Sequence, residues 1–251
     1  MRLHPRIRRA LALILLSWLP LCAARSKDEK KEKAKPEMID SGSFDVIVKG
    51  QHVVTETFSI EQQNGVSTVK SQVKAVAGDD PVKQKAELEF TSQGELLRYE
   101  WSQSSGGSLS VTPNNDFLLE RVTAPGSAKP AEQPFLMPST SAILDNNTFV
   151  QREVLAWRYL AADCKSEAGT LKCQQGAVEF GVLVPQDRTS MSVRMELVGK
   201  EKVTLGGAER ELLRLNLSGE NFQWNLWLDD QDHFKLMRVS IPADDTEVVR
   251  Q

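Results

Sequence analysis

Hydrophobic and polar residues alternate along short segments from residue 44 onward, and turn-forming residues interrupt the alternation about every ten residues. In Ala86–Phe90 and in Leu97–Trp101 every second residue is apolar, which is typical of strands with one face on a core. The sequences Gln63-Asn64-Gly65 and Gln93-Gly94 favour hairpin turns between such strands. The pattern therefore predicts a large antiparallel sheet.

The expected strands fall into two groups. In the first half of the chain they lie near residues 44–49, 53–61, 66–76, 82–91, 95–102, 108–112 and 117–122. In the second half they lie near residues 177–184, 190–198, 201–205, 209–217, 223–228, 234–241 and 247–250. Alternation points Trp227 away from Leu226, and Leu212 away from Leu213. Part of the second group is therefore expected to be covered on both faces.

One segment, Asp145–Ala161, has the period of a helix. Its apolar stripe consists of Val150, Val154, Trp157 and Ala161. Polar residues such as Arg152 and Arg158 fall outside this stripe, and the Asp or Asn side chains at positions 145–147 can cap the helix start. A single helix among many strands most often lies across an open sheet.

The segment 123–141 carries prolines at positions 125, 130, 134 and 138. Proline cannot donate to a strand ladder, so pairing is poorly supported in this stretch. We expect an extended crossover between the two groups of strands.

The first 24 residues have the three parts of a secretory signal peptide, with arginines first, an apolar stretch at Ala10–Leu21 and small residues before the expected cleavage near Ala24. The apolar stretch has 12 residues, whereas a membrane-crossing helix needs roughly 20. We therefore expect a periplasmic or secreted protein without a membrane-spanning segment in the mature chain. Cys22 could instead be the acylated first residue of a lipoprotein, although Leu21 is larger than that signal prefers.

Residues 25–42 begin with RSKDEKKEKAKPE, in which ten of 13 residues are charged. Such a stretch cannot bury itself, so we expect a charged disordered leader. The remaining residues, 43–251, are expected to form a single β-rich domain. Without residues 1–24 the chain has 27 basic and 34 acidic residues, a formal charge of −7. This acidic balance argues against nucleic acid as a partner.

Cys164 and Cys173 are the two cysteines that follow the expected signal peptide. In an oxidising compartment this spacing favours one local disulfide that closes a hairpin or loop. A zinc site would need further Cys or His ligands at suitable spacing, and the chain beyond residue 24 has only His52 and His233. We therefore expect a structural disulfide and no metal.

No short motif identifies a reaction. Asp40-Ser41-Gly42 matches the loop of aspartic proteases, but it directly follows the charged leader and is interpreted as a chance match. The acids of residues 229–232 are interpreted as a hairpin turn rather than a cation site. The sequence contains no serine nucleophile elbow, phosphate-binding glycine loop or dinucleotide fingerprint. No cofactor is expected.

Large apolar residues of the second half could line a binding site for an acyl chain or a similar ligand. The candidate wall consists of Trp157, Phe180, Val182, Leu213, Leu215, Trp224 and Leu226. The alternative is that these side chains simply fill the core.

The segment Trp224–Pro242, WNLWLDDQDHFKLMRVSIP, resembles a hairpin of bacterial exported proteins with a half-barrel fold, which include periplasmic lipoprotein carriers and uncharacterised relatives. In that group, one strand ends in an aromatic, an aliphatic and an aspartate residue. The strand that follows the turn has a basic residue among aliphatic residues. Those places are taken here by Trp227, Leu228, Asp229, Leu236 and Arg238. The segments ILDNNTFVQREVLAWRYL, FGVLVPQ and EVVR are similar to those of uncharacterised exported proteins.

This resemblance covers roughly residues 143–250. It implies a curved sheet with a helix against its concave side and, in the better-known members, a hydrophobic cavity. Cys164 and Cys173 belong to no carrier signature, and carrier function does not transfer with a fold. The predicted fold class is mainly β, with a large curved antiparallel sheet, an open half-barrel, and one covering α-helix.

The leading functional hypothesis is an exported, non-catalytic protein that binds a lipid, glycolipid or other amphipathic ligand in the cell envelope. A wide apolar sheet face, a covering helix and the lack of a catalytic motif motivate it. The first alternative is an envelope interaction or scaffold module with a packed core and a protein partner at an exposed strand edge. The weaker alternative is a hydrolase whose site assembles only in space.

Overall fold

The computed structural model describes residues 35–76, 83–167, 170–174 and 176–251. The expected signal peptide and residues 25–34 of the expected leader lie outside the described residues. Within the described part of the chain, no helix has the length and hydropathy that a membrane span requires.

The first half of the chain forms a meander in which each strand pairs antiparallel with the next. Its strands are β1 (Glu37–Val48), β2 (Gln51–Gln63), β3 (Val66–Ala75), β4 (Lys83–Thr91), β5 (Leu96–Gln103), β6 (Ser108–Asn114), β7 (Phe117–Thr123) and β8 (Ala131–Phe135). The turn at Asn64-Gly65 has positive φ at both residues, as the Asn-Gly sequence predicts.

The second half contains the one helix of the described residues longer than three residues. Its elements are β9 (Ala142–Ile143), α1 (Val150–Asp163), β10 (Cys164–Glu167), β11 (Thr170–Cys173), β12 (Val178–Val184), β13 (Thr189–Leu205), β14 (Ala208–Ser218), β15 (Gln223–Asp229), β16 (Lys235–Ile241) and β17 (Thr246–Arg250), with short 3-10 helices at Pro185–Asp187 and Pro242–Asp244. Strands β12 to β17 continue as antiparallel neighbours, and β9 joins β12 in parallel.

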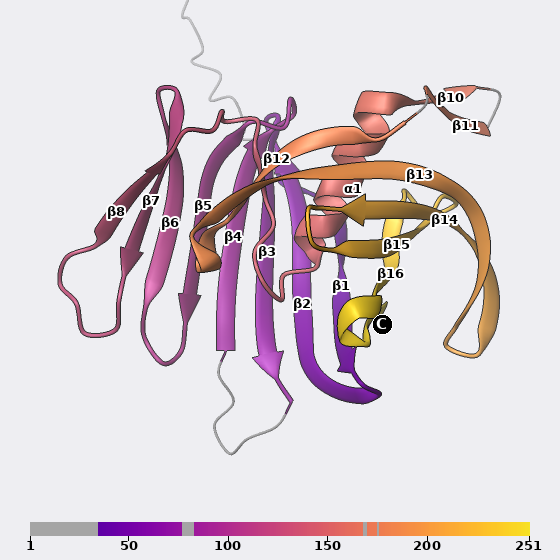
Figure 1. The fold of residues 1–251 in the computed structure, drawn as a ribbon, viewed down its shortest axis with the longest axis horizontal. Coiled ribbons are helices and arrows are strands. Elements are labelled where there is room, and N and C mark those ends of the chain that lie inside the picture. Colours follow the sequence, from indigo (N-terminus) through magenta and orange to yellow (C-terminus); the bar gives the residue numbers. More distant parts are fainter. Residues whose placement is uncertain (1–34, 77–82, 168–169, 175) are drawn as a thin grey trace, which may run out of the picture. The chain divides into compact units, whose positions relative to one another are not determined.

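The two halves form one open sheet of 15 strands, because β1 also pairs with β17. Its edges are β8 and β9. The sheet curves around α1 (Figure 1), and buried side chains of both halves share one core cluster with the helix. These observations confirm the predicted class, a mainly β open half-barrel with one covering helix.

The first strand begins at Glu37, so the prediction of a disordered leader up to residue 42 is wrong for residues 37–42. Backbone pairing with β2 carries this polar segment into the sheet. In addition, Asp40 Oδ1 accepts a hydrogen bond of 2.6 Å from Arg250 of β17. Asp40 also lies near Glu153 of α1. Burial and the neighbouring Asp40 charge raise the pKa of Glu153 well above its usual value. A long-range ion pair therefore orders residues 37–42, and the composition of this segment alone cannot predict such a contact.

The crossover prediction for residues 123–141 holds only in part. Residues Ala131–Phe135 form β8, which pairs with β7. Pro134 is compatible with this strand because β8 lies at the edge of the sheet, where a missing N–H can face solvent. Only residues 136–141 then cross from β8 towards β9.

Strand β13 joins two segments that the sequence predicts as separate strands. Its register with β14 shifts between Leu197 and Gly199, so Val198 forms a bulge and the inward positions change by one residue. Val203, beyond the bulge, packs in a second cluster with Leu212 and Trp227. The expectation that part of the second half is covered on both faces is thereby confirmed.

The helix begins at Val150 rather than at Asp145, and no side chain of residues 145–147 caps it. Glu56 of β2 takes that place, because its Oε2 accepts the backbone N–H groups of Phe149 at 2.6 Å and Val150 at 3.3 Å. A carboxylate at this position satisfies free N–H groups and is favoured by the helix dipole. The sheet therefore supplies the cap of its own helix.

A buried polar network surrounds this cap. Ser71 donates to Glu56 Oε1 at 2.6 Å, and the Arg152 guanidinium attracts the Glu56 charge while donating to the carbonyl of Thr148 at 2.8 Å. Asp145 Oδ2 accepts a hydrogen bond of 2.7 Å from Tyr99 of β5. Burial lowers the pKa of Arg152 to about 10. The network joins α1 to three strands of the first half.

The expected disulfide is confirmed, since Cys164 and Cys173 are bonded. They form a cross-strand pair of β10 and β11, which make up a separate two-stranded sheet just after α1. The bond therefore closes a peripheral hairpin.

We expect the substitution Glu56→Gln to remove a pH dependence of stability. Burial raises the pKa of Glu56 from 4.5 to about 7, so the folded protein keeps a proton that the unfolded chain releases. This contribution to stability is complete below about 4.5 and is lost as pH rises through about 7. Over this range the wild type should lose about 3 kcal/mol relative to Glu56→Gln.

Urea unfolding of both proteins between about pH 4 and pH 8 measures this change. Glu209→Gln is the matched control, because the Glu209 side chain is 64% exposed. A constant difference between wild type and Glu56→Gln across the range would contradict the raised pKa.

Replacing both bonded cysteines by serine should lower the melting temperature by no more than about 8 °C without preventing folding. Chain entropy for a loop of this size gives roughly 2.5 kcal/mol, and the peripheral hairpin contributes little to the core. Thermal unfolding followed by circular dichroism, with and without reductant, tests the expectation. An unchanged melting temperature in reductant would count against any contribution of the bond.

Candidate functional site

The predicted wall divides into a core part and an exposed part. Val182, Leu213, Leu215 and Leu226 are buried and pack inside the core cluster. Trp157, Phe180 and Trp224 are partly exposed and pack against that cluster from outside. The interior around the first four residues is filled, so only the partly exposed members are available to a ligand.

Trp157 and Phe180 line a groove of about 470 Å³ between α1 and the first half of the sheet. We call it the helix groove. The other five residues of the predicted wall lie outside it. Its sides are formed by Gln62, Ser67, Phe90 and the turn Thr91–Gly94 on one hand, and by Val154, Trp157, Arg158, Ala161, Ala162 and Phe180 on the other.

The helical side of the groove follows from spacing along α1. Val154, Trp157, Arg158, Ala161 and Ala162 recur at intervals of three and four residues, which places them on one side of a helix. This side is mostly apolar, as the predicted stripe requires, but Ala161 is exposed rather than packed in the core.

Trp157 is fixed in place by a long-range contact. Its indole N–H donates to the carbonyl of Phe234 at 2.9 Å. Phe234 has φ of 56°, a conformation that costs energy for a bulky residue. The turn before β16 therefore holds the tryptophan ring at the side of the groove.

Arg158 is the one charged residue that lines the helix groove. Its Nη2 donates to the carbonyl of Thr140 at 2.6 Å, and its guanidinium lies 5.6 Å from the Phe180 ring centroid. Among the described residues no carboxylate lies within ion-pair distance of it. Burial lowers the pKa of Arg158 and no acid offsets this effect. A partly desolvated cation without an acidic partner is uncommon in a folded protein.

A small inner cavity of about 20 Å³ meets the groove at Phe90, Gly94, Val154 and Arg158. It is lined mainly by apolar side chains, together with Arg158 and two uncharged polar side chains. Ser141 is 4% exposed, and its hydroxyl makes no hydrogen bond among the described residues. A cavity of this size admits about one small polar group.

The other polar group, Gln151, is oriented by its surroundings. Its Oε1 accepts a hydrogen bond from the Asp145 backbone N–H, so its Nε2 points elsewhere. This nitrogen interacts with the Tyr99 hydroxyl but makes no hydrogen bond of good geometry. Gln151 therefore connects the inner cavity to the network at the start of α1.

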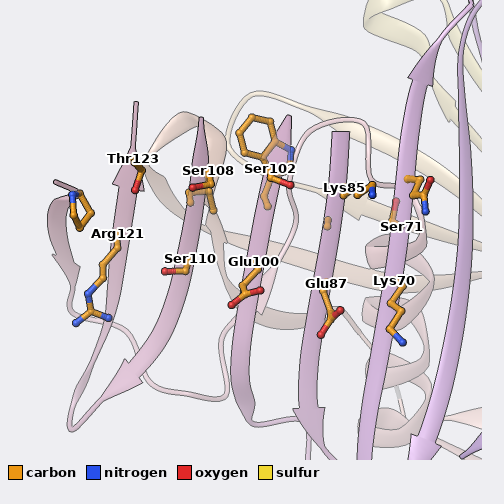
Figure 2. A pocket seen from close by; sticks show the side chains of 15 residues that line it. Lys70, Ser71, Lys85, Glu87, Glu100, Ser102, Ser108, Ser110, Arg121 and Thr123 are labelled. Carbon is orange, nitrogen blue, oxygen red and sulfur yellow. The ribbon is translucent and has the colours of Figure 1, made fainter. Parts of the chain in front are cut away.

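A larger concavity, of about 600 Å³, lies on a polar face of strands β3 to β7. Figure 2 shows its side chains across these strands. One row, set by the strand register, consists of Lys70, Glu87, Glu100, Ser110 and Arg121. These residues alternate with members of the core cluster, so they project from the opposite face of the sheet.

Several charges of this polar face pair across strands. Arg98 lies 2.8 Å from carboxylate oxygens of both Glu87 and Glu100. Arg121 pairs with Glu132 at 2.8 Å. A face with such cross-strand pairs is typical of the solvated side of an antiparallel sheet. The larger concavity therefore offers less for ligand recognition than the helix groove.

The other motifs of the sequence take structural roles. Asp40 is 4% exposed and forms an ion pair with Arg250, so it joins β1 to β17. Within the turn before β16, Asp230 pairs with Lys200 at 2.6 Å and Asp232 pairs with Lys235 at 2.9 Å. These contacts support the interpretation of that segment as a hairpin turn.

Two further clusters have the residue types of reactive sites. His52 Nε2 lies 3.1 Å from Asp45 and 2.9 Å from the hydroxyl of Thr55, at an exposed end of β2. Within the described residues, one group of potential metal ligands combines Asp163 with the two cysteines. Because those sulfurs are bonded to each other, neither offers a thiolate.

Comparisons with protein-family models, curated proteins and solved structures found no match to this chain. The resemblance to exported half-barrel proteins therefore stays a prediction.

The sequence predicts Trp157 and Phe180 as part of a ligand wall and Gln93-Gly94 as a hairpin turn, but it does not assign Arg158, Ser141 or this turn to a site. Arg158 lies outside the predicted apolar stripe, as most helix arginines do. A weak signal was present, because this arginine directly follows Trp157 and has no acid four residues before or after it.

Two arginines of α1 should respond differently to substitution by methionine. We expect Arg158→Met to change the free energy of unfolding by no more than about 1 kcal/mol, because the lost contacts are offset by removing a desolvated charge. Arg152→Met should cost about 3 kcal/mol, because it leaves Glu56 buried without its cation. Urea unfolding of both variants measures the contrast. Equal destabilisation by the two substitutions would assign Arg158 a structural role.

Proposed function

We propose that this protein is an exported, non-catalytic binder of an amphipathic ligand, and that the helix groove holds the apolar part of that ligand. The observation that carries the proposal is the combination, in one groove, of apolar walls with a single charged side chain that has no acidic partner among the described residues. Ligand sites commonly pair apolar walls with a few polar groups. The groove volume of about 470 Å³ falls within the usual range for such sites.

The energy of binding would come mainly from burial of hydrocarbon. Each CH₂ group removed from water contributes about 0.8 kcal/mol, and the partly exposed rings of Trp157 and Phe180 offer rigid surfaces for it. The ligand would lie at the side of the half-barrel and not in its interior, since the core is filled. This placement differs from the deep cavity that the sequence resemblance implies.

The same proposal locates the protein in the periplasm or outside the cell. Disulfides persist in oxidising compartments, and the bond between Cys164 and Cys173 is consistent with export. The expected signal peptide of residues 1–24 supports the same location.

The second candidate function is an envelope interaction module, favoured by the filled interior. Its simplest mode, strand addition at β8, is opposed by the local chemistry. Pro134 removes one N–H donor from the free edge, and proline at a sheet edge is a common device against pairing with other chains. The groove is therefore the better-supported binding surface.

A neutral fluorescent probe, N-phenyl-1-naphthylamine, tests the proposed site. We expect it to bind the wild type with enhanced fluorescence, and we expect Ala161→Trp to weaken binding about tenfold by filling the groove. Ala161 is exposed in the last turns of α1, so the larger ring should not disturb the core. Ala243→Trp, at an exposed alanine of the second 3-10 helix, is the matched control.

Native mass spectrometry of gently purified protein provides an independent measurement. A copurified amphiphile that raises the thermal stability when added back would support the proposal. Absence of probe binding, of copurified lipid and of any stabilisation by lipids would overturn it.

A further inference from the structure

We propose that the ligand of the helix groove is a single-chain amphiphile with a carboxylate head group, and that Arg158 and Ser141 recognise this head group. The inference rests on the proposed function and names the class of its ligand. It follows from the charge, burial and hydrogen-bonding state of these two residues.

The first argument is charge complementarity. Arg158 is partly buried between the turn Thr91–Gly94 and the Phe180 ring, and no acid of the described residues neutralises it. Removing a cation from water is costly unless an anion or several acceptors compensate. Among the described residues its hydrogen bond to the Thr140 carbonyl uses only one of its five donors. An anionic ligand group would supply the missing partner.

The second argument is the unsatisfied hydroxyl of Ser141. This side chain is 4% exposed, makes no hydrogen bond among the described residues and lines the inner cavity. Arg158 lines the same cavity as well as the groove. A buried hydroxyl without a partner costs free energy. Two residues that can donate hydrogen bonds therefore line the same inner cavity.

The third argument is size. The inner cavity of about 20 Å³ admits one small group, which fits a carboxylate oxygen better than a bulky phosphate ester. The groove of about 470 Å³ lies in the lower half of the range for small-molecule sites, which favours one hydrocarbon chain over two. The planar guanidinium also matches the geometry of a carboxylate. We therefore infer a long-chain monocarboxylate.

Displacement of N-phenyl-1-naphthylamine by three amphiphiles of equal chain length tests the inference. The competitors are dodecanoate, dodecanol and dodecyltrimethylammonium at about pH 8, where the acid is ionised. The two ions are used below their micelle concentrations and the alcohol below its solubility limit. For the wild type we expect dodecanoate to bind at least about tenfold more tightly than dodecanol, and the cation to bind most weakly.

Variants assign the preference to the two residues. Arg158→Gln should bring the affinities for dodecanoate and dodecanol to near parity, and Arg158→Lys should keep part of the preference. Ser141→Ala should reduce the preference severalfold. Arg194→Gln removes an exposed positive charge from β13 and should retain the full preference.

The outcomes separate the two proposals. If dodecanol and dodecanoate bind equally to the wild type, or if Arg158→Gln retains the preference, the head-group inference is wrong and the groove remains a site for apolar chains. If none of the amphiphiles displaces the probe and the probe itself does not bind, the proposed function is wrong. Unfolding of each variant in urea shows whether a loss of affinity reflects a loss of fold.

Discussion

The rest of the structure depends on the carboxylate of Glu56 at the start of α1. A helix enclosed by a sheet presents its first N–H groups to an apolar interior, where they must find acceptors. Glu56 of β2 meets Phe149 and Val150 there, and Ser71 and Arg152 in turn surround its charge. The cost of burying this acid is visible in its raised pKa. Because the contact fixes where α1 begins, it also fixes which residues of the helix reach the groove.

The strands could be predicted from the sequence because alternation is a local property. Features that depend on partners distant in the chain could not. The order of residues 37–42 depends on Arg250, more than two hundred residues away, and the helix cap depends on Glu56. The bulge at Val198 also left no local trace, since an extra residue in a strand looks like a short break between two strands.

For the candidate site, the sequence indicated an apolar surface but not which part of it stays accessible. Alternation shows that Val182 and Leu215 share a face with other apolar residues, but it does not show whether another layer covers that face. Here the sheet curves onto α1 and covers both of them. Trp157 and Phe180 lie where this cover ends, so they alone of the predicted wall line the groove. Accessibility is set by curvature, which is a property of the whole sheet.

The two arginines of α1 separate the part of the molecule that holds the fold from the part available for binding. Arg152 is 3% exposed, and it is attracted by Glu56, bonded to the carbonyl of Thr148 and packed on Trp224. Arg158, less than two turns further along, has an aromatic ring and one carbonyl but no acid. Both are desolvated, and among the described residues only the first lies near an acid that offsets this cost. The position of Arg158 near apolar walls, without a nearby acid among the described residues, favours a role in ligand binding over a role in stability. An apolar residue at this position would stabilise the fold at least as well.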